Sequence, residues 1–173
     1  FTNSRKNRRI QNLLFKDELT GLYNRRAYEE SLDRIRKEAS SEKMIVVAIF
    51  DVNGLKEVND KLGHASGDEL LRGAASTIRS VYGKYGKCYR TGGDEFVVIL
   101  EETVEKLFVL NENFEKAVAK WHGKQVEKLN ISYGAALSEE VCSIDEQIIL
   151  ADQRMYFDKK AYYQRMGKDR RSY

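Results

Sequence analysis

Two glycines followed at once by two acids form the most chemically suggestive segment of this 173-residue chain. Gly92-Gly93-Asp94-Glu95 joins a short run at 88–90 to an apolar run at 97–100. Adjacent glycines between such runs predict a β-hairpin, because glycine tolerates the positive φ of tight turns. Glycines also let a phosphate chain approach the backbone, and carboxylates supply the hard oxygens that Mg²⁺ prefers. The turn therefore predicts a metal–nucleotide site, which a hairpin alone would not need.

Asp51 supplies a second acidic position. It ends the apolar run 44–50, whose length and continuous hydrophobicity are typical of a strand covered on both faces. Ligand sites of α/β proteins gather at strand ends. If the two strands are neighbours, Asp51 and Asp94 converge and can hold one or two Mg²⁺ beside the phosphates of a nucleotide. For Asp51 taken alone, a strand end that simply faces water is the alternative.

The segment after Asp51 carries residues suited to a nucleotide. Lys56 is a candidate counter-charge for phosphate, and Asn59 and Asp68 are candidates for reading the base. A carboxylate accepts from the N1–H and N2–H₂ edge of guanine, and adenine offers no such donor pair. The alternative for Asp68 is an acid that favours a helix start through the helix dipole. His64, in the Gly-rich elbow 63–67, reads as a local hydrogen-bonding residue.

Composition excludes several classes of protein. Hydrophobic residues make up 42% of the chain and charged residues 33%, which is typical of a globular domain with a core. No apolar run approaches the ~20 residues of a membrane helix. A net charge of +3 is too mild to indicate nucleic acid, so we expect no nucleic-acid partner.

The two cysteines and the first residue bear on context. Cys88 and Cys142 are too few for a disulfide framework and too far apart for a local zinc motif, so we expect reduced thiols in a cytoplasmic domain. Because the chain starts at Phe1, we expect it to be a piece of a longer protein.

The elements that must position these residues can be read from hydrophobic periodicity. Asn24 is a good N-cap for a helix, and the hairpin interrupts an otherwise regular alternation of helices and strands. The pattern predicts helices near 25–39, 68–81, 102–121 and 144–163, and strands at 44–50, on both sides of the hairpin turn, and at 128–137. The fold class is therefore α/β, of the α+β kind, with a mixed sheet and helices on its faces.

Four motifs give the chain a family resemblance. The turn and the segment 51–68 resemble the GGDEF domain, the catalytic domain of bacterial diguanylate cyclases. The opening motif of that family is similar to residues 17–26, and its final-helix motif is similar to Ala151-Asp152, Met155-Tyr156 and Lys159. The motifs occur in family order and cover residues 17 to about 160.

The resemblance implies a fold and an activity. The fold would be a nucleotidyl cyclase or polymerase palm-like one, with a central five-stranded mixed sheet surrounded by helices and a β-hairpin carrying the turn. The activity would be condensation of two GTP into cyclic di-GMP with release of two pyrophosphates, dependent on Mg²⁺ or on Mn²⁺ in its place, across a homodimer. Residues 1–16 would be a linker or signalling helix from an upstream sensor domain, and 17–173 the catalytic domain. The domain would be cytoplasmic, and its parent protein could be anchored in a membrane.

The same resemblance implies metal and catalytic roles for four residues. Asp51, Asp94 and the Val52 carbonyl would bind the metal. Asp94, or alternatively Glu95, would help the 3′-hydroxyl to lose its proton. Metal binding and proton removal cannot be separated by sequence, because Mg²⁺ alone lowers the pKa of an alcohol.

Substrate contacts follow from the resemblance in the same way. Guanine would be held between helical side chains, and the triphosphate would meet lysines and the turn glycines. The residues implied are Asn59 and Asp68 for guanine with His64 nearby, Lys56 and Lys159 facing the phosphates, and Gly92 and Gly93 admitting them.

The chain departs from the family pattern at three places. Gly83-Lys84-Tyr85-Gly86 stands where many cyclases carry the inhibitory Arg-x-x-Asp, so we predict no product inhibition through this site. Tyr162 and Tyr163 stand where a Gly-Arg pair often follows the final-helix lysine. Asn53 and Gly54-Leu55 replace the acid and aromatic residues that are frequent there.

Two rival functions stay open. The first is a catalytically silent GGDEF module that binds GTP or mediates dimerisation as a regulator, and such modules usually have a damaged turn. The second is a cyclase that uses ATP, alone or together with GTP. The intact turn favours the active enzyme over the first rival, and Asp68 favours guanine over the second.

Overall fold

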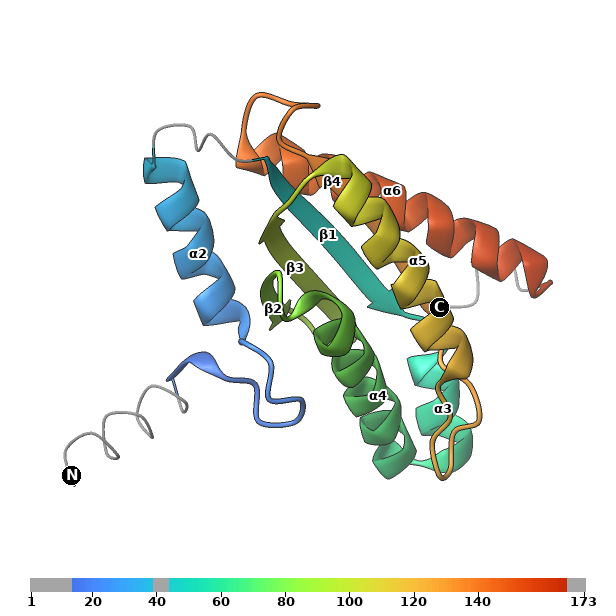
Figure 1. Ribbon diagram of the computed structural model, residues 1–173. Helices are drawn as coiled ribbons and strands as arrows, with labels where there is room; N and C mark the ends of the chain where they lie inside the picture. The colour runs from blue at the N-terminus through green and yellow to red at the C-terminus, as the bar shows by residue number, and fades with distance from the viewer. Residues whose placement is uncertain (1–13, 39–43, 168–173) are drawn as a thin grey trace, which may run out of the picture.

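A single antiparallel sheet organises the chain in the computed structural model, which describes residues 14–38 and 44–167 (Figure 1). The strand order is β2-β3-β1-β4, and all pairings between these strands are antiparallel. The strands are β1 (Ile45–Val52), β2 (Gly86–Arg90), β3 (Glu95–Glu101) and β4 (Ile131–Leu137). The central strand β1 is buried along nearly its whole length, as its continuous hydrophobicity predicts.

The expected α+β fold, one sheet with helices on its faces and a hairpin that carries the turn, is confirmed. Its detail differs, because the described residues form a sheet of four antiparallel strands and not a mixed sheet of five. Only the family resemblance implied a fifth strand, and no apolar run in the sequence corresponds to it. The mixed sheet was inferred from the alternation of helices and strands. Two helices return the chain to the far end of the sheet before β2 begins, so β2 runs in the same direction as β1. However, β3 lies between them, and each direct neighbour of β1 runs against it.

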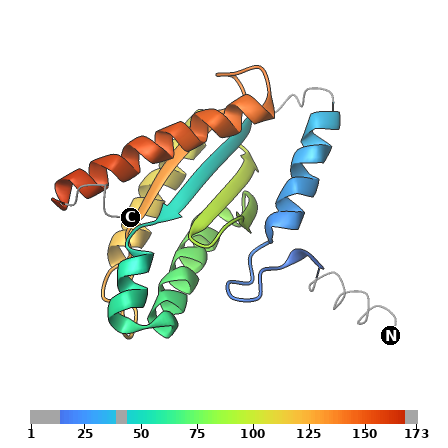
Figure 2. The ribbon, with the colours of Figure 1, turned by 180° about the vertical axis from the view of Figure 1, so that it is seen from behind.

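Helices cover both faces of the sheet and make three layers. In Figure 2, seen from behind, α6 crosses in front of the sheet, α5 lies beyond it, and α2 stands at the side of the sheet. Side chains of α2 and α6 pack in one core cluster, and those of α4 and α5 pack in the other. The helices are α2 (Arg25–Lys37), α3 (Leu55–Leu62), α4 (His64–Tyr82), α5 (Val104–Lys120) and α6 (Ile144–Arg165).

The alternation of β1 side chains divides the core in two. Val46, Ala48 and Phe50 point into the cluster shared with α4 and α5. Val47 and Ile49 point into the cluster shared with α2 and α6. Because the period is two, the next odd position, residue 51, also faces the α6 side of the sheet, and this places Asp51 under that helix.

Helix ends follow their capping residues. The predicted cap at Asn24 is confirmed, since its side chain accepts from the Ala27 N–H at 3.1 Å. The helix expected from residue 68 begins earlier, at His64, because Gly63 reverses the chain with φ +85 and lets the elbow form the first turn of α4. The predicted elbow is thus one glycine followed by helix.

Two expectations concern parts of the chain at its margins. The signalling helix expected at 1–16 lies outside the described residues, apart from its last three positions. Among the described helices, none combines the length and the hydrophobicity that a membrane span requires.

Candidate functional site

The candidate site lies at the end of the sheet where β1 finishes and β3 and β4 begin. Asp51 is only 7% exposed there. Its Oδ1 atom lies 2.7 Å from the Nζ atom of Lys159 on α6, which makes a part-buried ion pair. The two residues are 108 positions apart in the chain. The ion pair therefore exists only because α6 packs across the α2/α6 face of the sheet.

The acids of the turn lie on the strand beside Asp51. Asp51 is the register partner of Glu95 across β1 and β3. The backbone N–H of Val52 donates to the carbonyl oxygen of Asp94 at 2.9 Å. The two strands are neighbours, so the structure brings Asp51, Asp94 and Glu95 to one end of the sheet.

The electrostatics of Asp51 reflect this crowding. Burial raises the pKa of Asp51 above its ordinary value of 3.8. The hydrogen bond from Lys159 opposes that shift, whereas the charges of Asp94 and Glu95 reinforce it. A carboxylate in such surroundings is stabilised by any further cation that approaches, which is the electrostatic condition for a metal site.

The turn is held by bonds that the sequence did not predict. The side chain of Arg90 donates to the carbonyl oxygen of Gly93 at 2.8 Å and pairs with Asp17 at 3.2 Å. Thr91 Oγ1 donates to Glu95 Oε1 at 2.9 Å and so orients that carboxylate. The available signal was an arginine at the end of β2, directly before the turn. These contacts join the opening motif to the turn.

Asp17 has its own support in this network. Burial alone would raise its pKa, but hydrogen bonds from Thr20 and the charge of Arg90 hold the pKa of Asp17 below its usual value. Asp17 is therefore a stable anion that can keep Arg90 in place.

The turn glycines differ from expectation in one respect. The prediction of positive φ at Gly92 and Gly93 is wrong, since neither is among the glycines with positive φ. A Cβ added to Gly93 would meet nothing within 4 Å, and one added to Gly92 would meet only Glu95 Cβ at 3.4 Å. The glycines leave open space beside the acids, and the turn itself does not require them.

The candidate base-reading residues sit together on the α3–α4 pair. A Cβ on Gly67 would lie 1.9 Å from the Oδ1 atom of Asn59, so the Asn59 side chain rests directly on this glycine. Asp68 is the next residue along α4. His64 is exposed at the start of the same helix, and Lys56 is exposed in the first turn of α3.

The donor set at the strand end suits Mg²⁺. Asp51, Asp94 and the Val52 carbonyl are hard oxygen donors, and Mg²⁺ usually keeps waters and substrate phosphates for its remaining positions. Among residues 14–38 and 44–167, no group of three or more His, Cys, Asp or Glu side chains could hold a metal. Two carboxylates with a carbonyl do not need such a group.

Beside these donors, the Oδ1 atom of Asn53 is buried without a hydrogen-bond partner, while its Nδ2 donates to Ser132 at 2.8 Å. An orphaned acceptor here fits a site that is completed by an ordered ligand.

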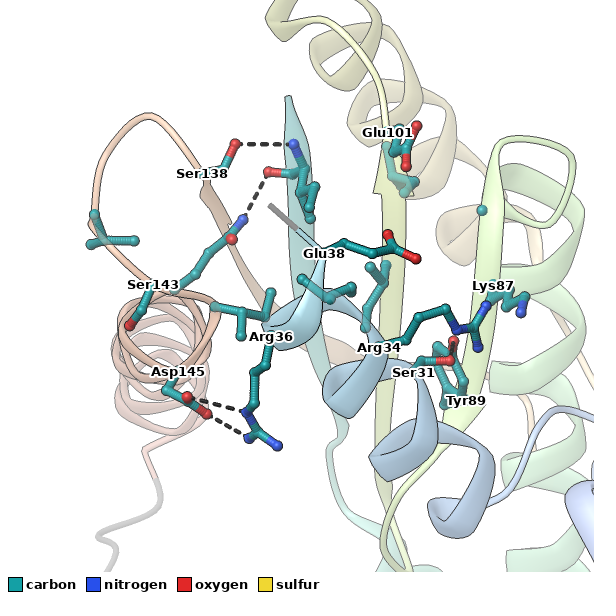
Figure 3. Close-up of a pocket in the computed structure, with 18 of the residues that line it drawn as sticks. Ser31, Arg34, Arg36, Glu38, Lys87, Tyr89, Glu101, Ser138, Ser143 and Asp145 are labelled. Atoms are coloured by element: carbon teal, nitrogen blue, oxygen red, sulfur yellow. Dashed lines mark hydrogen bonds and ion pairs between the residues drawn. The ribbon is translucent and has the colours of Figure 1, made fainter. Parts of the chain in front are cut away.

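A separate cavity of about 900 Å³ opens at the opposite end of the sheet, between α2 and the start of α6 (Figure 3). Arg36 pairs with Asp145 at 2.6 Å on its wall. Gln147 donates to the carbonyl oxygen of Ile45, and Ser138 accepts from the Ile45 N–H. None of the predicted site residues lines this cavity.

The fold and the site define an α+β domain with paired carboxylates beside a glycine turn at a strand end. This chain belongs to the GGDEF family: the family described as "Diguanylate cyclase, GGDEF domain" matches residues 14–165. The resemblance carried by the four motifs is therefore confirmed.

Curated relatives carry related names. The chain is 35% identical over 155 residues to the probable diguanylate cyclase DgcI of Escherichia coli K12, covering 87% of this chain and 32% of that protein. It is 31% identical over 169 residues to the diguanylate cyclase DgcN of the same organism, covering 94% and 40%. The chain thus spans well under two thirds of the length of these relatives.

Solved structures share the fold. The coiled coil and GGDEF domain of DgcB from Caulobacter crescentus, in complex with c-di-GMP, matches with a TM-score of 0.80 at 26% identity, covering 92% of this chain and 88% of that one. The diguanylate cyclase SiaD from Pseudomonas aeruginosa, in complex with its activator SiaC, matches with a TM-score of 0.79 at 27% identity, covering 92% and 64%.

Proposed function

We propose that this domain is an active diguanylate cyclase, which condenses two GTP into cyclic di-GMP and two pyrophosphates as a Mg²⁺-dependent homodimer. The observation that carries the proposal is the meeting of Asp51, the turn acids and Lys159 at one end of the sheet. Names of relatives that include diguanylate cyclases support it.

The reaction needs each GTP to be both nucleophile and electrophile. The 3′-oxygen of one GTP bonds to the α-phosphorus of the other GTP. The bond between that phosphorus and the oxygen that bridges it to the β-phosphate breaks, and pyrophosphate leaves. The ring closes when the 3′-oxygen of the second GTP attacks the α-phosphorus of the first in the same way, and a second pyrophosphate leaves. Catalysis of this kind rests on positioning and on charge stabilisation.

The metal-site residues would serve both needs. Asp51 and Asp94, with the Val52 carbonyl, would hold Mg²⁺. Bound Mg²⁺ would neutralise charge on the phosphate oxygens and lower the pKa of the attacking hydroxyl. Asp94, or Glu95 as oriented by Thr91, would accept the proton of that hydroxyl.

Recognition of GTP would fall to the helices around the site. Asn59 and Asp68 would bond the guanine edge, with His64 beside them. Lys56 and Lys159 would face the phosphates. Lys159 is bonded to Asp51 in the structure, so it would share its charge between that carboxylate and the triphosphate.

Partners and location follow from the same proposal. Each domain would hold one GTP, so a second copy must face the site. An upstream sensor domain would bring two copies together, with residues 1–16 as the connecting segment and 17–173 as the catalytic domain. The domain would act in the cytoplasm. A relative at 34% identity named "Uncharacterized membrane protein", from Staphylococcus epidermidis, is consistent with a membrane-anchored parent.

The test is product identification. The domain is incubated at high concentration with GTP, ATP or both, plus Mg²⁺, and the products are identified by mass spectrometry. Cyclic di-GMP that is lost in Asp94→Ala supports the proposal. GTP binding without turnover indicates a silent regulatory module, which the presence of Tyr162 and Tyr163 in place of the family's Gly-Arg pair would favour. A mixed dinucleotide indicates a hybrid cyclase.

A further inference from the structure

The loop between β1 and α3 carries a metal-site carboxylate at one end and a helix N-terminus at the other. Gly54 is the N-cap of α3, with φ +76 and no side-chain capping bond. A Cβ there would meet nothing within 4 Å, so the glycine is needed for its backbone angle and not for space. The N–H groups that open a helix have no partners within the helix. The direction of these groups therefore depends on what holds Gly54.

Helix α6 bonds this loop at both ends. The Nζ atom of Lys159 bonds Asp51 Oδ1 at 2.7 Å, and the hydroxyl oxygen of Tyr163 accepts from the Gly54 N–H at 3.3 Å. Lys159 and Tyr163 are four residues apart and share one face of the helix. The Tyr163 ring packs edge-on against Tyr162, with 5.1 Å between centroids, which limits its movement.

We propose that Tyr163 is a positioning residue for triphosphate binding, and this inference rests on the proposed function. Its hydroxyl fixes Gly54 in the left-handed turn and so aims the first N–H groups of α3 at the phosphates bound beside Asp51. Anions at a helix N-terminus are stabilised by such aimed N–H groups. Asn53, 5% exposed and in the same loop, has a buried Oδ1 atom without a partner, which marks the loop as built around a further ligand.

The hydrogen bond between Tyr163 and Gly54 is tested first, without nucleotide. Amide hydrogen exchange is followed at Gly54 by ¹⁵N NMR in Tyr163→Phe, which removes only the hydroxyl. The matched control is Tyr162→Phe, which removes the neighbouring hydroxyl. Exchange at Gly54 is expected to accelerate roughly three- to tenfold in Tyr163→Phe, because one hydrogen bond is lost. In the control, exchange at Gly54 is expected to stay at the wild-type rate. An unchanged Gly54 rate in Tyr163→Phe overturns the proposal.

The positioning role is tested by affinity and turnover. In Tyr163→Phe, the Kd of Mg²⁺·GTP, measured by calorimetry, and the KM for GTP are expected to rise roughly three- to tenfold, while kcat stays within about twofold. Tighter GTP binding means that the hydroxyl competes with phosphate, and a fall in kcat alone means that it acts elsewhere. Either result overturns the proposal.

The same measurements separate this proposal from the proposed function. A wild-type domain that binds GTP without turnover contradicts the cyclase activity. The change in the Kd of GTP in Tyr163→Phe then still tests the role of Tyr163 in triphosphate binding. A wild-type domain that binds no GTP contradicts both the cyclase activity and the role of Tyr163 in triphosphate binding.

Discussion

At the scale of single residues, Asp51 combines burial with a cluster of like charges. A carboxyl group whose folded-state pKa is raised binds its proton more tightly than the unfolded chain does. Its ionisation therefore costs stability, and this cost grows as pH rises from the ordinary value of 3.8 through the raised one. This cost falls at the position where the proposed metal site would need an ionised ligand, which supports a functional interpretation of Asp51.

As pH is lowered, metal affinity is consequently expected to begin to fall at a higher pH than at an ordinary aspartate site. Mn²⁺ serves as the probe, and the signal of the free ion is followed by electron paramagnetic resonance from about pH 8 down to the ordinary aspartate value of 3.8, without nucleotide. Below the raised pKa of Asp51, affinity should drop roughly tenfold per pH unit, because binding must first remove a proton. Asp51→Asn should bind weakly with a shallower dependence. Affinity that stays constant down to that ordinary value would contradict the raised pKa of Asp51.

Gly67 has a role that only the structure reveals. Its missing side chain leaves the space in which the Asn59 side chain lies, beside Asp68. In Gly67→Ala, the new methyl group would displace Asn59, and GTP affinity should fall about tenfold, the loss of roughly one good hydrogen bond. The unfolding free energy should change little, since alanine favours the helix by about 1 kcal/mol and offsets part of the strain.

A double-mutant cycle checks this route. Asn59→Ala should weaken GTP binding as Gly67→Ala does, and the two together should cost no more than either alone. Additive losses, measured by calorimetry, would mean that Gly67 acts on binding without Asn59.

At the scale of elements, β1, β3 and β4 were predictable because each contains an apolar run, and β2 because the glycine turn follows it. The 44–50 run and the Asn24 cap led to β1 and α2 with small errors at the ends. What failed needed long-range information. The Asp17–Arg90 pair and the Tyr163–Gly54 bond join segments whose proximity no local pattern encodes.

The site was predictable in part for the same reason. Asp51 and the turn acids each mark a strand end, so their meeting required only that the strands be neighbours. Lys159 came from the resemblance, and its ion pair with Asp51 depends on how closely α6 lies on the sheet. That distance is set by packing and leaves no periodic trace in the sequence.

Gly134 sets this packing. A Cβ there would lie 2.2 Å from the Met155 backbone nitrogen and 2.4 Å from the Ala151 carbonyl oxygen, so only glycine lets α6 lie this close to β4. Gly134→Ala should lower the unfolding free energy by roughly 1–3 kcal/mol, the usual cost of overpacking. Urea unfolding measures the loss. Cyclase activity should fall too, because α6 carries Lys159.

Ala135→Gly is the matched control, since it removes a methyl group from the next residue of β4 and adds no bulk against α6. It should cost less than Gly134→Ala. If Gly134→Ala unfolds within about 0.5 kcal/mol of the wild type, the close approach of α6 is not a constraint on the fold.

At the scale of the whole molecule, the described fold separates two regions. The acids, the turn and the α3–α4 pair gather at one end of the sheet, and the large cavity lies at the other. One domain presents one set of guanine-reading and metal-binding candidates. If the proposed reaction is correct, one domain therefore supplies half of what two phosphodiester bonds require.

This division predicts how defective and intact copies behave together. In a dimer of one wild-type and one Asp94→Ala protomer, one of the two metal sites is lost, so one phosphodiester bond forms and the ring stays open. Wild-type domain mixed with excess Asp94→Ala should therefore release less cyclic di-GMP and accumulate the linear dinucleotide, both measured by mass spectrometry. At low concentration of wild type alone, the rate should rise roughly with the square of concentration, because dimers form by mass action. Cyclic product that stays proportional to wild-type protein under both conditions would mean that a single chain completes both bonds, and the second copy would then have no part in the chemistry.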